Sequence, residues 1–190
     1  EKLPNFRETV GYCDNLKRTG KASPATKLCI NDLLLEMNHF LDRHPGYDVF
    51  AESGDSLFGG LELRLRAGGL YFSQSYYASM GFAVPAAIGA ELGRGRRTLI
   101  LSGDGAFQMT GPEISRAPRH GVAPIVVLVD NSGWQIFRPV SPRPDLLAIP
   151  PWPYAELAQQ WGGVGFRADT RGALREALRA AHERNVFAVI

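Results

Sequence analysis

Apolar residues recur along the chain with two periods, one typical of helices and one typical of buried strands. The first helical segment has four apolar residues at helical spacing: Ile30, Leu34, Met37 and Leu41. Ser23 followed by Pro24 predicts the start of this helix, and Pro45-Gly46 predicts its end. Further helices are expected at residues 79–93, 111–121, 154–163 and 171–181, with Pro118 interrupting the second and Asp169 or Thr170 capping the last.

Short, continuous apolar runs alternate with these helical segments and predict strands. The runs are YDVFAES (47–53), RTLILSG (97–103), PIVVLVDN (124–131), VGFRA (164–168) and NVFAVI (185–190). Strands without apolar-polar alternation are typical of a sheet that helices cover on both faces. The alternation of strand and helix therefore predicts an α/β protein with three αβα layers and a mostly parallel sheet.

Composition narrows the class of protein. The chain has 190 residues, enough for one sizeable domain, and a net charge of +2, which gives no reason to expect nucleic acid or a membrane as partner. Cys13 and Cys29 have no spacing typical of zinc sites or disulfide frameworks, so we expect a reducing, cytoplasmic setting. We expect residues 1–23 to be a linker and residues 24–190 to be one domain of a longer protein.

Three loops that follow predicted strands contain glycine together with polar side chains: ESGDS (52–56), SGDGAF (102–107) and DNSGW (130–134). Glycine lets the backbone approach a ligand, and its N–H groups can bind phosphate. An acid at such a place repels phosphate unless a divalent cation lies between them, and Asp104 with Asn131 offers the oxygen ligands that Mg²⁺ accepts. The alternative is that Gly-Asp-Gly is an ordinary turn.

The sequence GDGAFQMTGPEIS followed by VDNSGW resembles the fingerprint of thiamine-diphosphate enzymes. From about Lys27 to Ile190, the chain is similar to the C-terminal domain of the pyruvate decarboxylase group, closest to the indolepyruvate and phenylpyruvate decarboxylases. The resemblance implies that Asp104, Asn131 and the carbonyl of Gly133 hold Mg²⁺, which binds the diphosphate. It also implies cofactor contacts from the surrounding residues Gly103, Gly105, Ala106 and Phe107.

Two further segments match the family. In YYASMGF, the resemblance implies two catalytic roles: Met80 lies under the bridge between the two cofactor rings, and the carbonyl of Ala78 accepts a hydrogen bond from the 4′-amino group. Without the family match, packing as a core residue is the favoured explanation of Met80. In ESGDS, the residues implied to contact the cofactor are Ser53, Gly54 and Asp55, although Asp55 can also be a turn or capping residue.

Three positions depart from the family pattern. Asp130 replaces the first asparagine of the pair, and Ala106 stands where many relatives have a hydroxyl that contacts phosphate. Phe137 stands where pyruvate decarboxylases have an acid, which resembles the phenylpyruvate enzymes and favours a larger or aromatic substrate. Trp134 and Phe137 are thus candidate substrate residues, with ordinary packing as the alternative.

The resemblance implies a non-oxidative 2-keto acid decarboxylase that releases CO₂ and an aldehyde. It also implies a homo-oligomer, in which an N-terminal pyrimidine-binding domain, usually from another subunit, completes the site. We then expect exposed apolar residues near the site. Two alternatives are a carboligase of the acetolactate synthase type and a binding module that has lost activity. A nicotinamide site is not favoured, because no GxGxxG follows a predicted strand.

Overall fold

Six parallel strands form the centre of the protein. A computed structural model describes residues 24–190 except 26 and 67, so Ser23 and the linker predicted at 1–23 lie outside the described residues. The sheet has the order β2-β1-β3-β4-β6-β5, and every neighbouring pair is parallel. The strands are β1 (Tyr47–Ala51), β2 (Tyr71–Ser73), β3 (Arg97–Gly103), β4 (Ile125–Val129), β5 (Val164–Gly165) and β6 (Ala188–Val189).

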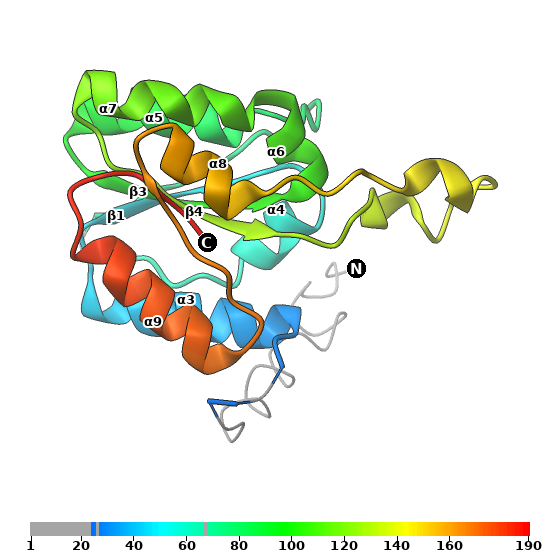
Figure 1. The fold of residues 1–190 in the computed structure, drawn as a ribbon, viewed down its shortest axis with the longest axis horizontal. Coiled ribbons are helices and arrows are strands. Elements are labelled where there is room, and N and C mark those ends of the chain that lie inside the picture. The colour runs from blue at the N-terminus through cyan, green and yellow to red at the C-terminus, as the bar shows by residue number, and fades with distance from the viewer. Residues whose placement is uncertain (1–23, 26, 67) are drawn as a thin grey trace, which may run out of the picture.

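Helices cover both faces of this sheet (Figure 1). One face carries α3 (Ile30–Arg43) and α9 (Arg171–His182). The other carries α5 (Ala83–Arg94), α6 (Asp104–Thr110), the 3₁₀ helix η1 (Gly111–Arg116), α7 (Ala117–His120) and α8 (Tyr154–Gln160). A short helix, α4 (Asp55–Gly60), follows β1. The predicted three-layer α/β fold is confirmed.

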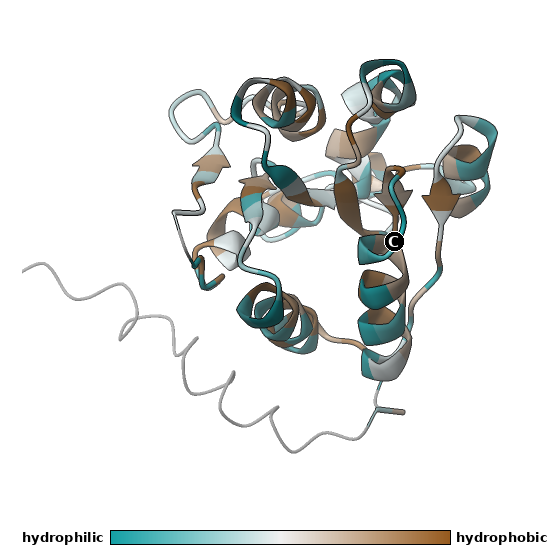
Figure 2. Ribbon diagram, turned by 90° about the vertical axis from the view of Figure 1, so that its left-hand side faces the viewer, coloured by the Kyte–Doolittle hydropathy of each residue, from teal (hydrophilic) through white to brown (hydrophobic). Residues whose placement is uncertain are grey.

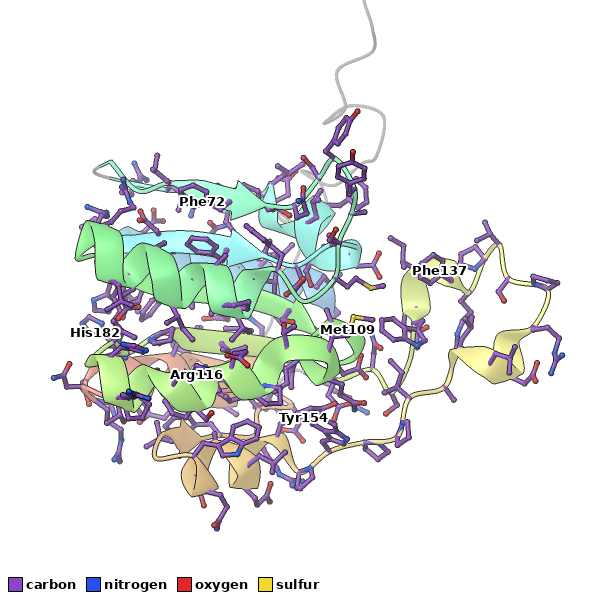
Figure 3. The ribbon with its side chains drawn as sticks, turned by 90° about the horizontal axis from the view of Figure 1, so that it is seen from above. Phe72, Met109, Arg116, Phe137, Tyr154 and His182 are labelled. Carbon is purple, nitrogen blue, oxygen red and sulfur yellow. The ribbon has the colours of Figure 1, made fainter. Side chains whose placement is uncertain are left out.

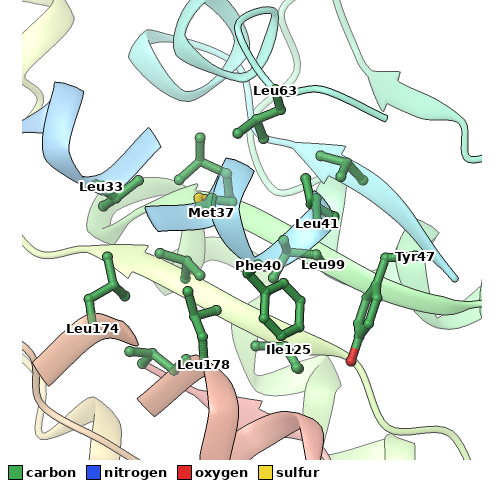
Figure 4. Packing of buried hydrophobic residues seen from close by; sticks show 14 of the residues in the cluster. Leu33, Met37, Phe40, Leu41, Tyr47, Leu63, Leu99, Ile125, Leu174 and Leu178 are labelled. Carbon is green, nitrogen blue, oxygen red and sulfur yellow. The ribbon is translucent and has the colours of Figure 1, made fainter. Parts of the chain in front are cut away.

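Each face of the sheet has its own hydrophobic core. Leu99 and Ile125 pack with Phe40 of α3 and Leu178 of α9 on one side (Figure 4). The strands are mainly hydrophobic, whereas the helices combine hydrophobic and hydrophilic residues (Figure 2). None of the described helices has the length and hydrophobicity that a membrane span requires.

Some predicted helix boundaries are wrong. The first helix begins at Ile30 rather than near Pro24, because the preceding residues extend toward the start of α9. The N–H of Leu28 donates to the carbonyl of Asp169 at 2.9 Å. The predicted cap Thr170 is confirmed, since its hydroxyl accepts the N–H of Ala173 at 3.2 Å.

Two other elements differ from the prediction because of local geometry. Helix α5 begins at Ala83, not at Ser79, since Gly81 before it has a φ of 88°. The three-residue edge strand β2 was not predicted. The crossover after β3 is helical from Asp104 and is divided into α6, η1 and α7, with Pro118 in the first turn of α7, where its missing N–H is tolerated.

The strand order creates a switch point between β1 and β3. From β1 the chain moves outward to β2, and from β3 it moves in the opposite direction to β4. In open parallel sheets, ligands bind at the carboxyl ends of the strands where the direction changes. The loops after β1, β3 and β4, which the sequence singled out, all leave from this edge.

A histidine pair lies at the opposite edge of the sheet. The rings of His44 and His182 are 3.8 Å apart, and Nδ1 of His182 lies 2.9 Å from the hydroxyl of Tyr47. Figure 3 shows His182 at the end of the molecule far from Phe137. Burial lowers the pKa of both histidines, and the neighbouring charges of Arg43 and Arg97 lower it further, against an opposing effect of Glu183 on His182.

Replacing His182 by glutamine is expected to weaken the loss of stability on acidification. Below pH 6.5 or so, the ordinary pKa of histidine, the unfolded chain takes up protons that the folded pair resists, so the free energy of unfolding falls. Urea unfolding at pH 7.5 and 5.5 measures this fall, which should be smaller in His182→Gln than in the unchanged protein. The exposed His120 provides the control variant, His120→Gln. Equal falls in all three proteins would contradict the role of the pair.

Candidate functional site

A cavity of about 700 Å³ lies at the carboxyl edge of β1, β3 and β4. It is lined by eleven of the predicted site residues: Ser53, Gly54, Asp55, Met80, Gly103, Asp104, Gly105, Ala106, Asn131, Gly133 and Trp134. A second cavity, of about 750 Å³, is lined by none of the predicted site residues. The first cavity is therefore the candidate site.

Asp104 and Asn131 meet at one backbone group. The N–H of Gly133 lies 3.2 Å from Oδ2 of Asp104 and 3.2 Å from Oδ1 of Asn131. The register of β3 and β4, with Gly103 opposite Val129, brings these two residues to the same level of the edge. Two side-chain oxygens from different loops thus converge at the cavity wall.

Asp104 is held at the first position of α6 and is 2% exposed. Its Oδ1 accepts the N–H of Gly105 at 2.8 Å. Burial raises the pKa of Asp104, and the charge of Asp130 raises it further, while backbone N–H groups of Gly105, Ser132 and Gly133 act in the opposite direction. The backbone N–H groups therefore offset only part of the cost of burying the ionised carboxylate.

The donor set of the cavity fits a divalent cation with a diphosphate. Asp55, Glu62 and Asp104 line the cavity, and no lysine, arginine or histidine does so among the described residues. Those residues also contain no cluster of three or more His, Cys, Asp or Glu side chains that could hold a metal by itself. Mg²⁺ typically binds one or two protein oxygens and completes its shell with water and phosphate oxygens. The Gly133 carbonyl accepts the Gln135 N–H at 2.9 Å and retains a lone pair for such an ion.

Two residues without glycine's freedom have left-handed backbone conformations beside the cavity. Ser132, between Asn131 and Gly133, has a φ of 56°, and Ala78, two residues before Met80, has a φ of 50°. Such conformations are uncommon for side chains with a Cβ and persist only where the surroundings impose them. Both lie in loops that were predicted to contact the cofactor.

Trp134 packs against the Gly105 backbone. A Cβ built on Gly105 would lie 2.5 Å from Cζ3 of Trp134 and 2.8 Å from Cδ1 of Ile149. Only glycine at position 105 lets the indole approach this closely. Trp134 therefore both lines the cavity and holds the Asn131–Gly133 loop against the start of α6.

Three predicted site residues do not line the cavity. Phe107 is 1% exposed and belongs to the hydrophobic core beside Tyr154. Ala78 is exposed, outside the cavity wall. Phe137 is 46% exposed and lies on residues 134–147, an arm that extends away from the sheet in Figures 1 and 3.

Other residues at the site were not predicted. Ile30, Phe58, Ile136 and Glu62 line the cavity from α3, α4 and neighbouring loops, and no motif in the sequence marks them. Glu52 is 1% exposed and accepts backbone N–H groups from Gly81 and Ala83. An acid that directly follows a buried apolar run is the signal that could have identified Glu52.

Comparison with known families agrees with this geometry. Residues 54–190 match the family model "Thiamine pyrophosphate enzyme, C-terminal TPP binding domain". The chain belongs to this family. The predicted family resemblance is confirmed, and thiamine diphosphate is the cofactor of such a domain.

Curated relatives are similar over most of this TPP-binding chain. It is 41% identical over 183 residues to "Indole-3-pyruvate decarboxylase" of Azospirillum brasilense, covering 94% of this chain and 32% of that protein. It is 36% identical over 148 residues to "Alpha-keto-acid decarboxylase" of Mycobacterium bovis (strain BCG / Pasteur 1173P2), covering 74% of this chain and 26% of the relative. The chain therefore spans about a third or less of the length of these relatives.

Gly105→Ala is expected to destabilise the TPP-binding domain by about 1–3 kcal/mol, because the added methyl group forces Trp134 and Ile149 to move. Gly89→Ala is the matched control: Gly89 lies within α5, and a Cβ there meets nothing within 4 Å. This control should stabilise the protein by about 0.5–1 kcal/mol. Urea unfolding followed by tryptophan fluorescence measures both. A Gly105→Ala protein as stable as the Gly89→Ala protein would contradict the close packing of Trp134.

Proposed function

We propose that this chain is the diphosphate- and Mg²⁺-binding half of a non-oxidative 2-keto acid decarboxylase that depends on thiamine diphosphate. The observation that carries the proposal is the convergence of Asp104 and Asn131 oxygens in a cavity without basic side chains. A diphosphate cannot bind beside that carboxylate without a cation. The names of the relatives, indole-3-pyruvate and alpha-keto-acid decarboxylase, support the reaction.

In this proposal, Asp104, Asn131 and the Gly133 carbonyl hold Mg²⁺, and the ion binds the diphosphate. The backbone of the glycine-rich turn surrounds the diphosphate with residues Gly103, Gly105, Ala106 and Phe107. The β1 loop contacts the cofactor between its diphosphate and its pyrimidine with residues Ser53, Gly54 and Asp55. Backbone contacts do not require a side chain in the cavity, so the buried ring of Phe107 is compatible with this role.

Met80 and Ala78 are proposed to act on the cofactor rings. Met80 lines the cavity and supports the bridge between the rings, where an adaptable, bulky side chain is suitable. The Ala78 carbonyl accepts a hydrogen bond from the 4′-amino group. When bound, thiamine diphosphate would supply the carbon nucleophile and the electron sink that decarboxylation of a 2-keto acid requires.

The substrate proposed is a 2-keto acid with a large or aromatic side chain, of the indolepyruvate or phenylpyruvate type. Phe58, Trp134 and Ile136 give the cavity an apolar part suited to such a group. Phe137 remains a candidate substrate residue, on the arm. Phe137 would contact substrate only if another part of the enzyme packed against the arm and enclosed the substrate there.

We further propose that residues 24–190 act as one domain of a cytoplasmic homo-oligomer, with an N-terminal pyrimidine-binding domain completing the site from another subunit. Phe58, which lines the cavity, has an exposed apolar side chain, and so do residues in the segments that follow β1, β2 and β3: Leu61, Tyr76, Tyr77 and Met109. Such residues are typical of a surface that another chain covers.

Asp104→Ala in the full-length protein is expected to weaken Mg²⁺-dependent binding of thiamine diphosphate by at least about 100-fold, since the cation loses its anionic protein ligand. Isothermal titration calorimetry with the cofactor and Mg²⁺ measures this. Asp130→Asn is the matched control, because Asp130 is exposed and does not line the cavity. Its Kd should stay within a few-fold. An unchanged Kd in Asp104→Ala would defeat the metal site.

Product analysis separates the reactions open to the family. With phenylpyruvate or indolepyruvate and saturating cofactor, the full-length protein should release CO₂ and the free aldehyde in equal amounts. A hydroxyketone product would instead indicate a carboligase. Absence of cofactor binding in the full-length protein would indicate a module without activity.

A further inference from the structure

Glu52 connects the end of β1 to the segment that contains Met80. Its Oε2 accepts the N–H of Gly81 at 3.0 Å and its Oε1 accepts the N–H of Ala83 at 2.7 Å. The side chain is 1% exposed and does not line the cavity. Glu52 therefore acts on this segment and is not available as a ligand contact.

The segment before α5 needs such an external partner. The first N–H groups of a helix have no acceptor within the helix, and the N-cap residue Phe82 supplies no side-chain acceptor for them. Left-handed φ values of 50° at Ala78 and 88° at Gly81 place Met80 between two sharp changes of chain direction. Burial raises the pKa of Glu52, and backbone N–H groups on and around the turn, those of Ala83, Gly81, Ser53 and Phe82, favour its ionised form.

Two other side chains hold the same segment from the neighbouring loops. Thr110, at the end of α6, donates its hydroxyl to the Gly81 carbonyl at 2.6 Å. Ser53 donates to the carbonyl of Gln74 at 3.0 Å and lies 3.4 Å from that of Ser79. Thr110 and Ser53 contribute neutral hydroxyl groups, whereas Glu52 contributes a buried carboxylate. Hydrogen bonds to a charged group are stronger than those between neutral groups.

We propose that Glu52 is the positioning residue of the cofactor site, fixing Met80 at the edge of β1 by accepting the Gly81 and Ala83 N–H groups. The inference rests on the proposed function, in which Met80 supports the bridge of the cofactor. Glu52 touches neither cofactor nor substrate. Its effect is on where Met80 and the Ala78 carbonyl stand relative to the diphosphate site held by Asp104.

The test is Glu52→Gln in the full-length protein. The amide has the shape of the carboxylate but offers one acceptor oxygen and places an NH₂ group against a backbone N–H. Glu91→Gln is the matched control, because Glu91 is also a buried carboxylate that accepts two backbone N–H groups, from Thr98 at 3.1 Å and Ala123 at 2.6 Å. Those groups lie at the start of β3 and before β4, away from the cavity.

The first readout is amide hydrogen exchange of residues 78–83 without cofactor. Exchange should be faster by on the order of tenfold to a hundredfold in Glu52→Gln, and unchanged in Glu91→Gln. Equal protection in Glu52→Gln and the unchanged protein would overturn the proposal. If Glu52→Gln does not fold, Glu52→Asp, whose side chain is one methylene too short to keep both hydrogen bonds, should show faster exchange in the same segment, and unchanged exchange there would overturn the proposal.

The second readout is the exchange of the C2 proton of bound thiamine diphosphate with solvent deuterium, followed by NMR at saturating cofactor and Mg²⁺. This exchange of the C2 proton should be at least tenfold slower in Glu52→Gln. The Kd for thiamine diphosphate should change only a few-fold, because the diphosphate is bound at the Asp104 site and not at Met80. An unchanged C2 exchange rate together with faster amide exchange would overturn the positioning of Met80. Failure of the unchanged protein to bind cofactor would instead overturn the proposed function, and the amide exchange would still report whether Glu52 holds the segment.

Discussion

The candidate site depends on a buried carboxylate that has no ion pair with the described residues. Asp104 is 2% exposed, and it accepts hydrogen bonds from backbone N–H groups, among them those of Gly105 and Gly133. Neutral donors offset only part of the cost of removing an anion from water, and Asp130 adds repulsion. A bound cation would offset the remaining cost, and this is the physical basis of the proposed Mg²⁺ site.

Sheet topology explains why this carboxylate lies close to residues that are distant in the sequence. Parallel pairing of β1 with β3 and of β3 with β4 places three strand exits side by side. The chain direction reverses between β1 and β3, so no crossover connection blocks the space above them. The order of the strands determines where the cavity lies. The few residues after the carboxyl end of each strand determine which ligands the cavity can bind.

The sequence predicted those parts of the fold that local patterns determine. Strands β3 and β4 are mainly apolar runs. Asp104 directly follows β3 and Asn131 is the second residue after β4, so both the sheet edge and the convergence of the two side chains could be anticipated. The start of α3 could not, because hydrogen bonding to the region of Asp169 draws the residues before Cys29 away from a helix. The position of Phe137 on an arm depends on contacts at the base of the arm, where Gly133 pairs with Ala148, and no local pattern indicates it.

Asp104 and Glu52 follow neighbouring strands and are both buried, but they differ in the donors around them. Glu52 turns away from the cavity and faces the N–H groups that begin α5, so its negative charge is used within the protein. Asp104 lines the cavity and accepts the backbone N–H groups of Gly105 and Gly133. In the roles proposed above, the carboxylate that accepts the N–H groups of α5 fixes the backbone, and the one that lines the cavity binds a cation. An acid after a strand therefore does not by itself identify a metal ligand.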